Sequence, residues 1–203
     1  MKLLNKIINK ILLLFKDEVL PPEYHFKREQ INRIRLQYKF KILIETGTFF
    51  GETVEYFKNV FDRVYSIELS EELADQAKEK FINDQNVCII HGDSGEVLKN
   101  LIVSINEPIL FWLDGHYSSE FLVGGKYIKT AKGKKDTPIK EEIEAVLQSK
   151  FDHVILIDDA RLFLGIDDYP SISSIKRLVW KNRKNYITTV EHDIIYIKPN
   201  KKD

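Results

Sequence analysis

The sequence predicts an α/β fold, with a doubly wound sheet of seven strands that is mostly parallel and ends in an antiparallel hairpin. Its apolar runs are short and do not alternate with polar residues, as expected of parallel strands covered on both faces. The last two runs, Ile187–Val190 and Ile194–Ile197, are joined through His192-Asp193 with no room for a crossover helix. Strands joined so tightly must be antiparallel.

Apolar periodicity and capping residues place the elements in the first half of the chain. In order, we expect a helical stretch near Glu23–Tyr38, a buried strand at Ile42–Thr46, a helix at Glu52–Asn59, a strand at Val64–Leu69, a helix at Glu71–Phe81, a strand at Val87–His91 and a helix at Gly95–Val103. Ser70 is a good N-cap for the helix that follows it, and acidic residues in the first turn of that helix suit its dipole.

The second half of the chain continues the alternation of strands and helices. In order, we expect a strand at Ile109–Leu113, a long loop at about His116–Asp136, a helix at Ile139–Ser149, a strand at Val154–Ile157, a helix at Ser171–Asn182 and two final strands within Tyr186–Lys198. The loop is long for a compact domain, which favours a functional role for it.

The first sixteen residues form a separate pattern, in which lysines are the only charged residues and one helical face carries Leu4, Ile7, Ile8, Ile11 and Phe15. This pattern predicts a basic amphipathic helix. Pro21-Pro22 then breaks the chain, so we expect an N-terminal appendage at 1–22 and one domain at 23–203. The helix could pack on that domain, join two copies as a homodimer, or contact an anionic membrane surface through residues 1–16, but its apolar run is too short to span a bilayer.

Composition is that of an ordinary globular protein. Acidic and basic residues balance at 31 each, so nothing in the global charge calls for a nucleic-acid partner. The single cysteine, Cys88, cannot form an internal disulfide, which is consistent with a reducing cytoplasm. Because Cys88 lies in an apolar run, we expect it to be a small core residue.

The segment Glu45–Gly51 is the most informative part of the chain. An apolar run ends in an acid, Gly47 follows two residues later, and Gly51 lies four residues beyond it, where a helical pattern starts. Glycine permits a tight turn and close packing of the helix start against the strand. Such a strand, turn and helix are typical of a nucleotide-sized ligand site.

This segment resembles the first motif, E-x-G-x-x-x-G, of the class I S-adenosylmethionine-dependent methyltransferases, which have a Rossmann-like sheet that ends in an antiparallel hairpin. The form E-x-G-T-x-x-G is similar to that of small metal-dependent O-methyltransferases. The resemblance covers about residues 40–199. It implies S-adenosylmethionine as cofactor, and it implies that the cofactor-binding residues are Glu45, Gly47, Thr48, Gly51, Glu68, Leu69, Asp93, Ser94 and Asp114.

Two further acids support a nucleotide-binding edge. Glu68 closes the second strand 21 residues after Gly47, where a carboxylate can accept both ribose hydroxyls. Asp93 follows the third strand, at the position where the family has an acid that accepts from the adenine amino group. The plain alternative for both residues is a solvated turn or a helix cap.

Acids also follow the fourth and fifth strands, as Asp114 and as Asp158-Asp159. Because these strand ends lie beside each other in a doubly wound sheet, three carboxylates meet, which is costly unless a cation or a proton binds. Oxygen ligands suit Mg²⁺ or another hard divalent cation. The resemblance implies Asp114, Asp158 and Asp159 as the metal ligands. Alternatively, these residues cap turns, or Arg161 neutralises an acid without metal.

The long loop is rich in lysine, with Lys126, Lys129, Lys132, Lys134 and Lys135 against two acids. A basic loop over an active site would suit a small acceptor that is anionic or contains a sugar. A solvated loop kept soluble by lysines is the alternative. His116, at the start of the loop, is the best candidate for the catalytic base, because its ordinary pKa is near neutrality.

The function expected from these features is transfer of a methyl group from S-adenosylmethionine to a hydroxyl, with Asp114 and His116 as catalytic residues and a divalent cation lowering the pKa of the hydroxyl. Two alternatives stay open. One is an NAD-binding oxidoreductase, which the terminal hairpin and the absence of a Tyr-x-x-x-Lys pair disfavour. The other is a non-catalytic module that binds the cofactor.

Overall fold

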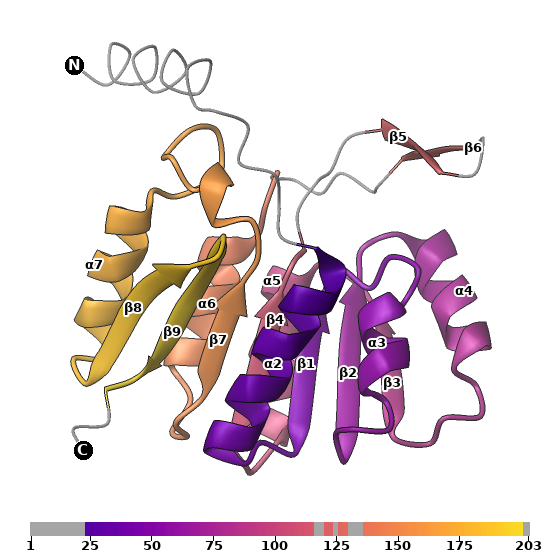
Figure 1. Cartoon of the computed structure of the whole chain (residues 1–203), viewed down its shortest axis with the longest axis horizontal. Helices are drawn as coiled ribbons and strands as arrows, with labels where there is room; N and C mark the ends of the chain where they lie inside the picture. The colour runs from indigo at the N-terminus through magenta and orange to yellow at the C-terminus, as the bar shows by residue number, and fades with distance from the viewer. Residues whose placement is uncertain (1–22, 116–119, 124–125, 130–135, 201–203) are drawn as a thin grey trace.

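The computed structural model describes residues 23–115, 120–123, 126–129 and 136–200. Its main sheet contains β1 Ile42–Thr46, β2 Arg63–Glu68, β3 Val87–His91, β4 Ile109–Leu113, β7 Val154–Ile157, β8 Tyr186–Glu191 and β9 Ile194–Pro199. The strand order is β3-β2-β1-β4-β7-β9-β8 (Figure 1). The strands β3, β2, β1, β4 and β7 are parallel to one another, whereas β9 is antiparallel to both β7 and β8. The predicted fold class is confirmed.

Six described α-helices cover the two faces of this sheet. They are α2 Tyr24–Tyr38, α3 Glu52–Phe57, α4 Glu71–Lys80, α5 Ser94–Ser104, α6 Ile139–Leu147 and α7 Ile172–Asn182. One apolar cluster packs α2, α3 and α4 against the sheet, and a second packs α5, α6 and α7 against the opposite face. Figure 1 shows this division, with α2 and α3 in front of the sheet and α5 behind it.

The core lies along the central strands. Every residue of β1, β4 and β7 is buried, because helices cover these strands on both faces. Alternate side chains go to opposite faces: Leu43 packs with the helices α2–α4 and Ile44 with α5–α7. The continuous apolar runs in the sequence therefore reflect burial on both sides of the strand.

The hairpin prediction also holds in detail. Strands β8 and β9 pair through Glu191 and Ile194, which leaves His192 and Asp193 as a two-residue turn. Both turn residues have positive φ, at 49° and 62°, as the tight turns that match strand twist require. Asp193 also accepts from the backbone N–H of Arg161, so the hairpin turn is attached to the segment after β7.

Two expectations about local structure are corrected. Cys88 is exposed, because β3 is an edge strand of the sheet and is covered less completely than the central strands. The segment predicted as a loop contains two short antiparallel strands, β5 Glu120–Val123 and β6 Lys126–Lys129, which form a separate sheet. Glycines at positions 124 and 125 in the sequence are a hairpin signal that accounts for this pair.

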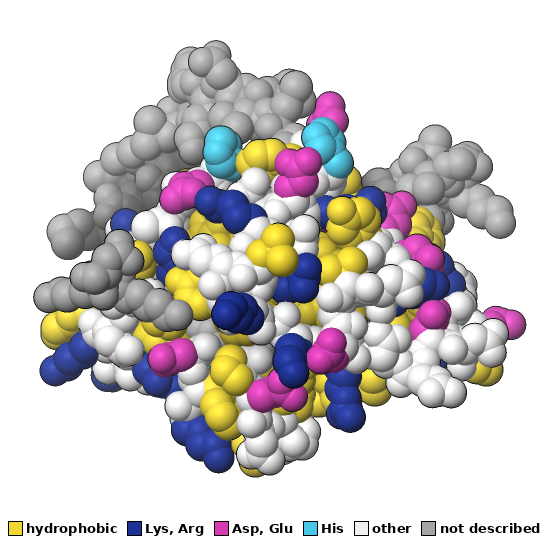
Figure 2. All heavy atoms as spheres, turned by 60° about the horizontal axis from the view of Figure 1, so that its bottom comes forward, with side chains coloured by type: hydrophobic (Ala, Val, Ile, Leu, Met, Phe, Trp, Pro, Cys, Tyr) yellow, Lys and Arg dark blue, Asp and Glu magenta, His cyan; other side chains and the backbone are white. Residues whose placement is uncertain are grey.

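Several sequence-based expectations lie outside the described residues. These are the amphipathic helix within 1–22, with its membrane or dimer contact, and the part of the lysine-rich loop at 116–119, 124–125 and 130–135, which includes His116. None of the helices described within 23–200 is long and apolar enough to cross a membrane. On the face shown in Figure 2, described basic, acidic and hydrophobic side chains are interspersed.

Candidate functional site

The carboxyl ends of the parallel strands meet where the chain reverses its direction of winding. Strand β1 lies between β2 and β4, so the chain winds one way from β1 to β3 and the other way from β4 onward. Ligands of such sheets bind at this switch point. The backbone beyond the strands is joined there: Gly47 N–H donates to Ile67 O (2.9 Å), and Asp114 N–H donates to Thr46 O (3.1 Å).

The glycine turn after β1 is closely packed. Gly47 has φ +84°, and a Cβ atom added there would lie 2.7 Å from the carbonyl oxygen of Asp114. Gly51 has φ +71°, and its added Cβ would lie 2.7 Å from the ring of Phe81. Both the left-handed conformation and the missing side chain are therefore needed, as the sequence indicated for these two glycines.

Glu68 holds the glycine turn from the end of β2. One carboxylate oxygen accepts from the backbone N–H of Phe49 and the other from that of Ser70, each at 2.9 Å. A carboxylate has about four acceptor positions, so these two bonds leave capacity for ligand hydroxyls. Phe49 itself has φ 48°, a strained value for a residue other than glycine, which the contact with Glu68 helps to maintain.

Beneath the turn, Glu45 begins a buried chain of hydroxyl contacts. Ser66, its partner across β1 and β2, donates to the Glu45 carboxyl at 2.6 Å, and Ser66 lies 2.7 Å from the Thr48 hydroxyl. Burial raises the pKa of Glu45 to about 8, so this carboxyl is mostly protonated at pH 7. Glu45 and Thr48 therefore support the turn from below.

The third strand ends in a helix start. Asp93 is the N-cap of α5, and its carboxylate accepts from Gly95 N–H at 2.9 Å. Ser94, the first residue of that helix, is buried, and Leu69 beyond β2 is half-buried. Asp93 therefore caps the helix, as the alternative reading of the sequence suggested. The Asp93 side chain is half-buried at the same edge of the sheet as Glu68.

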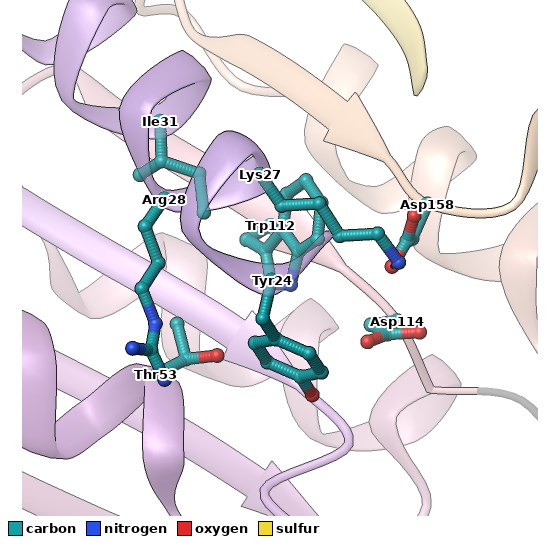
Figure 3. A pocket seen from close by; sticks show the side chains of 8 residues that line it. All are labelled: Tyr24, Lys27, Arg28, Ile31, Thr53, Trp112, Asp114 and Asp158. Carbon is teal, nitrogen blue, oxygen red and sulfur yellow. Dashed lines mark hydrogen bonds and ion pairs between the residues drawn. The ribbon is translucent and has the colours of Figure 1, made fainter. Parts of the chain in front are cut away.

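A pocket lies beside Asp114, between the strand ends and helix α2. Figure 3 shows its lining residues, which are Tyr24, Lys27, Arg28, Ile31, Thr53, Trp112, Asp114 and Asp158. In this view the ring of Tyr24 lies between Thr53 and Asp114, and Lys27 extends toward Asp158. Helix α2 thus supplies one wall of the candidate site.

Each acid of the pair after β7 contacts a basic side chain. Lys27 Nζ lies 2.5 Å from Asp158 Oδ2 and 3.7 Å from Asp159 Oδ1. Arg161 contacts Asp159 at 2.8 Å and also pairs with Asp193 of the hairpin turn. The sequence hypothesis that Arg161 neutralises a neighbouring acid is confirmed by these contacts.

Burial shifts the protonation of the Lys27–Asp158 pair. It raises the pKa of Asp158 to about 7, the charges of Asp114 and Asp159 add to the rise, and Lys27 opposes it. Burial alone would lower the pKa of Lys27, yet the carboxylates, Asp158 foremost, raise it above its ordinary value. Lys27 is therefore a firmly held ammonium group.

The residues do not fit the divalent cation predicted from sequence. Among the residues that the structure describes, no group of three or more His, Cys, Asp or Glu side chains is arranged to hold a metal ion. A hard cation would need to lie about 2.0–2.6 Å from carboxylate oxygens. The Lys27 ammonium already contacts Asp158 at that place.

Most of the predicted site residues share one edge of the sheet. Glu45 lies near the end of β1, Gly47, Thr48 and Gly51 lie in the turn after it, and Glu68 ends β2. The others follow the ends of the strands, and these are Leu69, Asp93, Ser94, Asp114, Asp158 and Asp159. No ligand contact tests their individual roles, which stay predictions. His116, the predicted base, lies outside the described residues.

Sequence reasoning missed three polar side chains. Lys27 and Tyr24 line the pocket from α2, and Glu142 of α6 is buried near Gly115. Burial raises the pKa of Glu142 to about 7. The available signal was position: Lys27 and Glu142 each occupy the apolar stripe of an amphipathic helix, where a charged residue is unexpected.

Comparisons with solved structures agree with this fold. No family model matches the chain, and no curated protein matches it. Among solved structures, the O-methyltransferase TomG from Streptomyces achromogenes, involved in tomaymycin synthesis and in complex with S-adenosylmethionine, matches with a TM-score of 0.59 and 16% identity, over 88% of this chain and 81% of that one.

An O-methyltransferase from Bacillus cereus, in complex with S-adenosylhomocysteine, matches with a TM-score of 0.56 and 16% identity, over 97% of this chain and 89% of that one. At identities this low, the structural matches show a shared fold alone. Strand order, the antiparallel hairpin and these structural neighbours together show that the chain has the fold of the class I S-adenosylmethionine-dependent methyltransferases.

Proposed function

We propose that this chain transfers the methyl group of S-adenosylmethionine to a hydroxyl oxygen of a small acceptor. One observation carries the proposal: the Gly47 turn, Glu68 and Asp93 follow three adjacent strands, β1, β2 and β3, at one edge of the sheet. Proteins with the same fold are solved with S-adenosylmethionine or with its demethylated product.

Each part of the cofactor has a candidate partner in this arrangement. The turn at Gly47–Gly51 would hold the methionine part, Glu68 would accept from the ribose hydroxyls, and Asp93 with Ser94 would face the adenine. Thr48 and Glu45 would keep the turn in shape through Ser66. Leu69 would contact the nucleoside beside Glu68.

Bound S-adenosylmethionine would supply a methyl group on a positively charged sulfur, which makes that carbon electrophilic. The protein then has to hold the acceptor oxygen in line with the methyl carbon and accept the hydroxyl proton. As the O–C bond forms, the C–S bond breaks and its electron pair stays on sulfur. His116 is the candidate base, and Asp114 lines the reactive end of the site.

For the methyl acceptor we propose only a chemical class. Lysines at 126 and 129 belong to the strand pair β5–β6 between Asp114 and α6, and further lysines follow them in the sequence. This composition favours an anionic or sugar-containing small molecule. A divalent cation is left out of the proposed mechanism, because Lys27 contacts the carboxylate that would have to bind it.

Calorimetry tests the proposal. The wild type should bind S-adenosylmethionine and S-adenosylhomocysteine, whereas NADH should not bind. Glu68→Gln, which removes the charge that the ribose hydroxyls would contact, should weaken the binding of both ligands by about tenfold or more. Glu71→Gln, on an exposed residue nearby in the first turn of α4, is the matched control and should bind normally.

The outcomes separate the alternatives. Binding of NADH in place of S-adenosylmethionine would favour the oxidoreductase hypothesis. Binding of neither would sink the proposed function. Binding of S-adenosylmethionine without formation of S-adenosylhomocysteine, across a panel of hydroxyl acceptors, would indicate a non-catalytic module.

A further inference from the structure

Lys27 lies where the sequence predicted a metal. Its side chain is only 11% exposed, and that of Asp158 only 2%, so the pair is shielded from water. The two residues are 131 positions apart in the chain, and helix α2 brings them together. The contact is therefore a product of the fold and belongs to the wall of the pocket.

We propose that the Lys27 ammonium takes the place of a divalent cation beside Asp158 and Asp159, so that this site works without metal, and that it faces the acceptor oxygen in the pocket. The part of this inference that concerns the acceptor rests on the proposed methyl transfer. The part that concerns metal does not.

Charge repulsion sets the Lys27 ammonium against a metal ion at Asp158. Lys27 Nζ is 2.5 Å from Asp158 Oδ2 and 3.7 Å from Asp159 Oδ1, so it lies within ion-pair distance of both carboxylates. A metal ion bound to the same oxygen would need to lie about 2.0–2.6 Å from it. Two cations on one buried carboxylate would lie only roughly 4 Å apart and would repel strongly.

The rest of the site keeps Lys27 in this position. Tyr24 lies one helical turn earlier, and the centroid of its ring is 5.8 Å from the ammonium nitrogen of Lys27. Ile31, one turn later, is 1% exposed and anchors the same face of α2 in the core. The second acid, Asp159, is also paired with Arg161, which a metal would have to displace as well.

The ammonium has hydrogen-bonding capacity beyond this pair. A lysine side chain carries three N–H donors, and one is directed to Asp158. A donor aimed into the pocket would stabilise negative charge that develops on an acceptor oxygen, as a metal ion does in other enzymes. Lys27 would thereby hold the acceptor while a separate base removes its proton.

Titration with Mn²⁺, followed by electron paramagnetic resonance, tests the metal part directly. The wild type should show no saturable binding at Asp158. Lys27→Ala removes the ammonium and opens the space between the carboxylates, so this variant should bind Mn²⁺ at least about tenfold more tightly. Lys27→Ala/Asp158→Asn should lose the gained binding.

Two further variants control the experiment. Lys41→Ala removes an exposed lysine that pairs with Asp62 at 3.9 Å on the surface, and it should bind Mn²⁺ as the wild type does. Lys27→Arg keeps a cation in place and should also gain no metal. Circular dichroism of each variant shows whether it is folded, and if Lys27→Ala does not fold, Lys27→Ser provides the same opening with a polar side chain.

Two results would overturn the inference. One is saturable Mn²⁺ binding by the wild type that Asp158→Asn abolishes. The other is a folded Lys27→Ala variant that gains no Mn²⁺ binding. Binding of S-adenosylmethionine is measured on the same samples and should stay within about threefold of the wild type in every variant. A failure of the wild type to bind it would reject the proposed function and leave the metal result interpretable.

Discussion

Replacing Lys27 with methionine should destabilise the protein strongly and in a pH-dependent way. Methionine retains much of the aliphatic stem and removes the charge, so the buried Asp158 carboxylate would lose the ammonium that faces it. Removal of one partner of a buried ion pair costs about 3–5 kcal/mol of the free energy of unfolding. An exposed pair such as Lys41–Asp62 contributes only about 0–1 kcal/mol, so Lys41→Met is the control.

The pH dependence follows from the sign of the Asp158 shift. Its pKa is raised to about 7 in the folded protein, above the ordinary value for aspartate, and loss of Lys27 would raise it further. A carboxyl with a raised pKa loses stability as the pH rises through that pKa. The cost of Lys27→Met should therefore be about 3–5 kcal/mol at pH 8.5 and clearly smaller at pH 5.

Urea unfolding at both pH values measures these differences, and Lys27→Met/Asp158→Asn should recover most of the loss at pH 8.5. The reasoning would be refuted by a Lys27→Met variant within about 1 kcal/mol of the wild type at pH 8.5. A double variant no more stable than the single one would contradict it equally.

Three further predictions concern other positions in the fold. Gly47→Ala should cost at least about 1–2 kcal/mol by urea unfolding, because its φ is +84° and the new Cβ would meet Asp114 O; a neutral result would show that the turn can relax. Burial raises the pKa of Glu142 to about 7, so the protein loses stability as the pH rises through 7. Glu142→Gln should therefore raise the free energy of unfolding by up to about 3 kcal/mol at pH 8.5 but not at pH 4.5. An equal effect of this substitution at both pH values would contradict the raised pKa. Burial lowers the pKa of His153 to about 4, so this residue should contribute a loss of up to about 3 kcal/mol to the free energy of unfolding as the pH falls from 6.5 to 4. The stability of the wild type relative to His153→Gln should fall by that amount over this range, and parallel curves for the two proteins would reject this assignment.

The fold could be predicted because its determinants are local in sequence. Each central strand is a continuous apolar run, and the turn at His192-Asp193 leaves no room for a crossover, so the antiparallel hairpin followed directly. The glycines of the turn carried an equally local signal, which their positive φ angles explain. Cys88 was misjudged because an apolar run does not reveal whether its strand lies at the edge of the sheet.

The composition of the site was predictable only in part. The acids at the strand ends could be placed, since parallel strands bring their carboxyl ends to one edge. The cation that faces Asp158 comes from α2, where Lys27 lies on the apolar stripe, but a lysine there ordinarily extends its charge to water, so its position alone did not show which acid it would contact. The expectation of a metal followed from counting carboxylates without this partner.

A crystal structure of the chain with S-adenosylhomocysteine tests the central claim most directly. We expect the homocysteine part over the turn at Gly47–Gly51, the ribose hydroxyls within hydrogen-bond distance of Glu68, and the adenine beside Asp93. We also expect the Lys27 ammonium to contact Asp158 in that structure. A nucleoside bound elsewhere, or bound at this edge without contact to Glu68, would contradict the account.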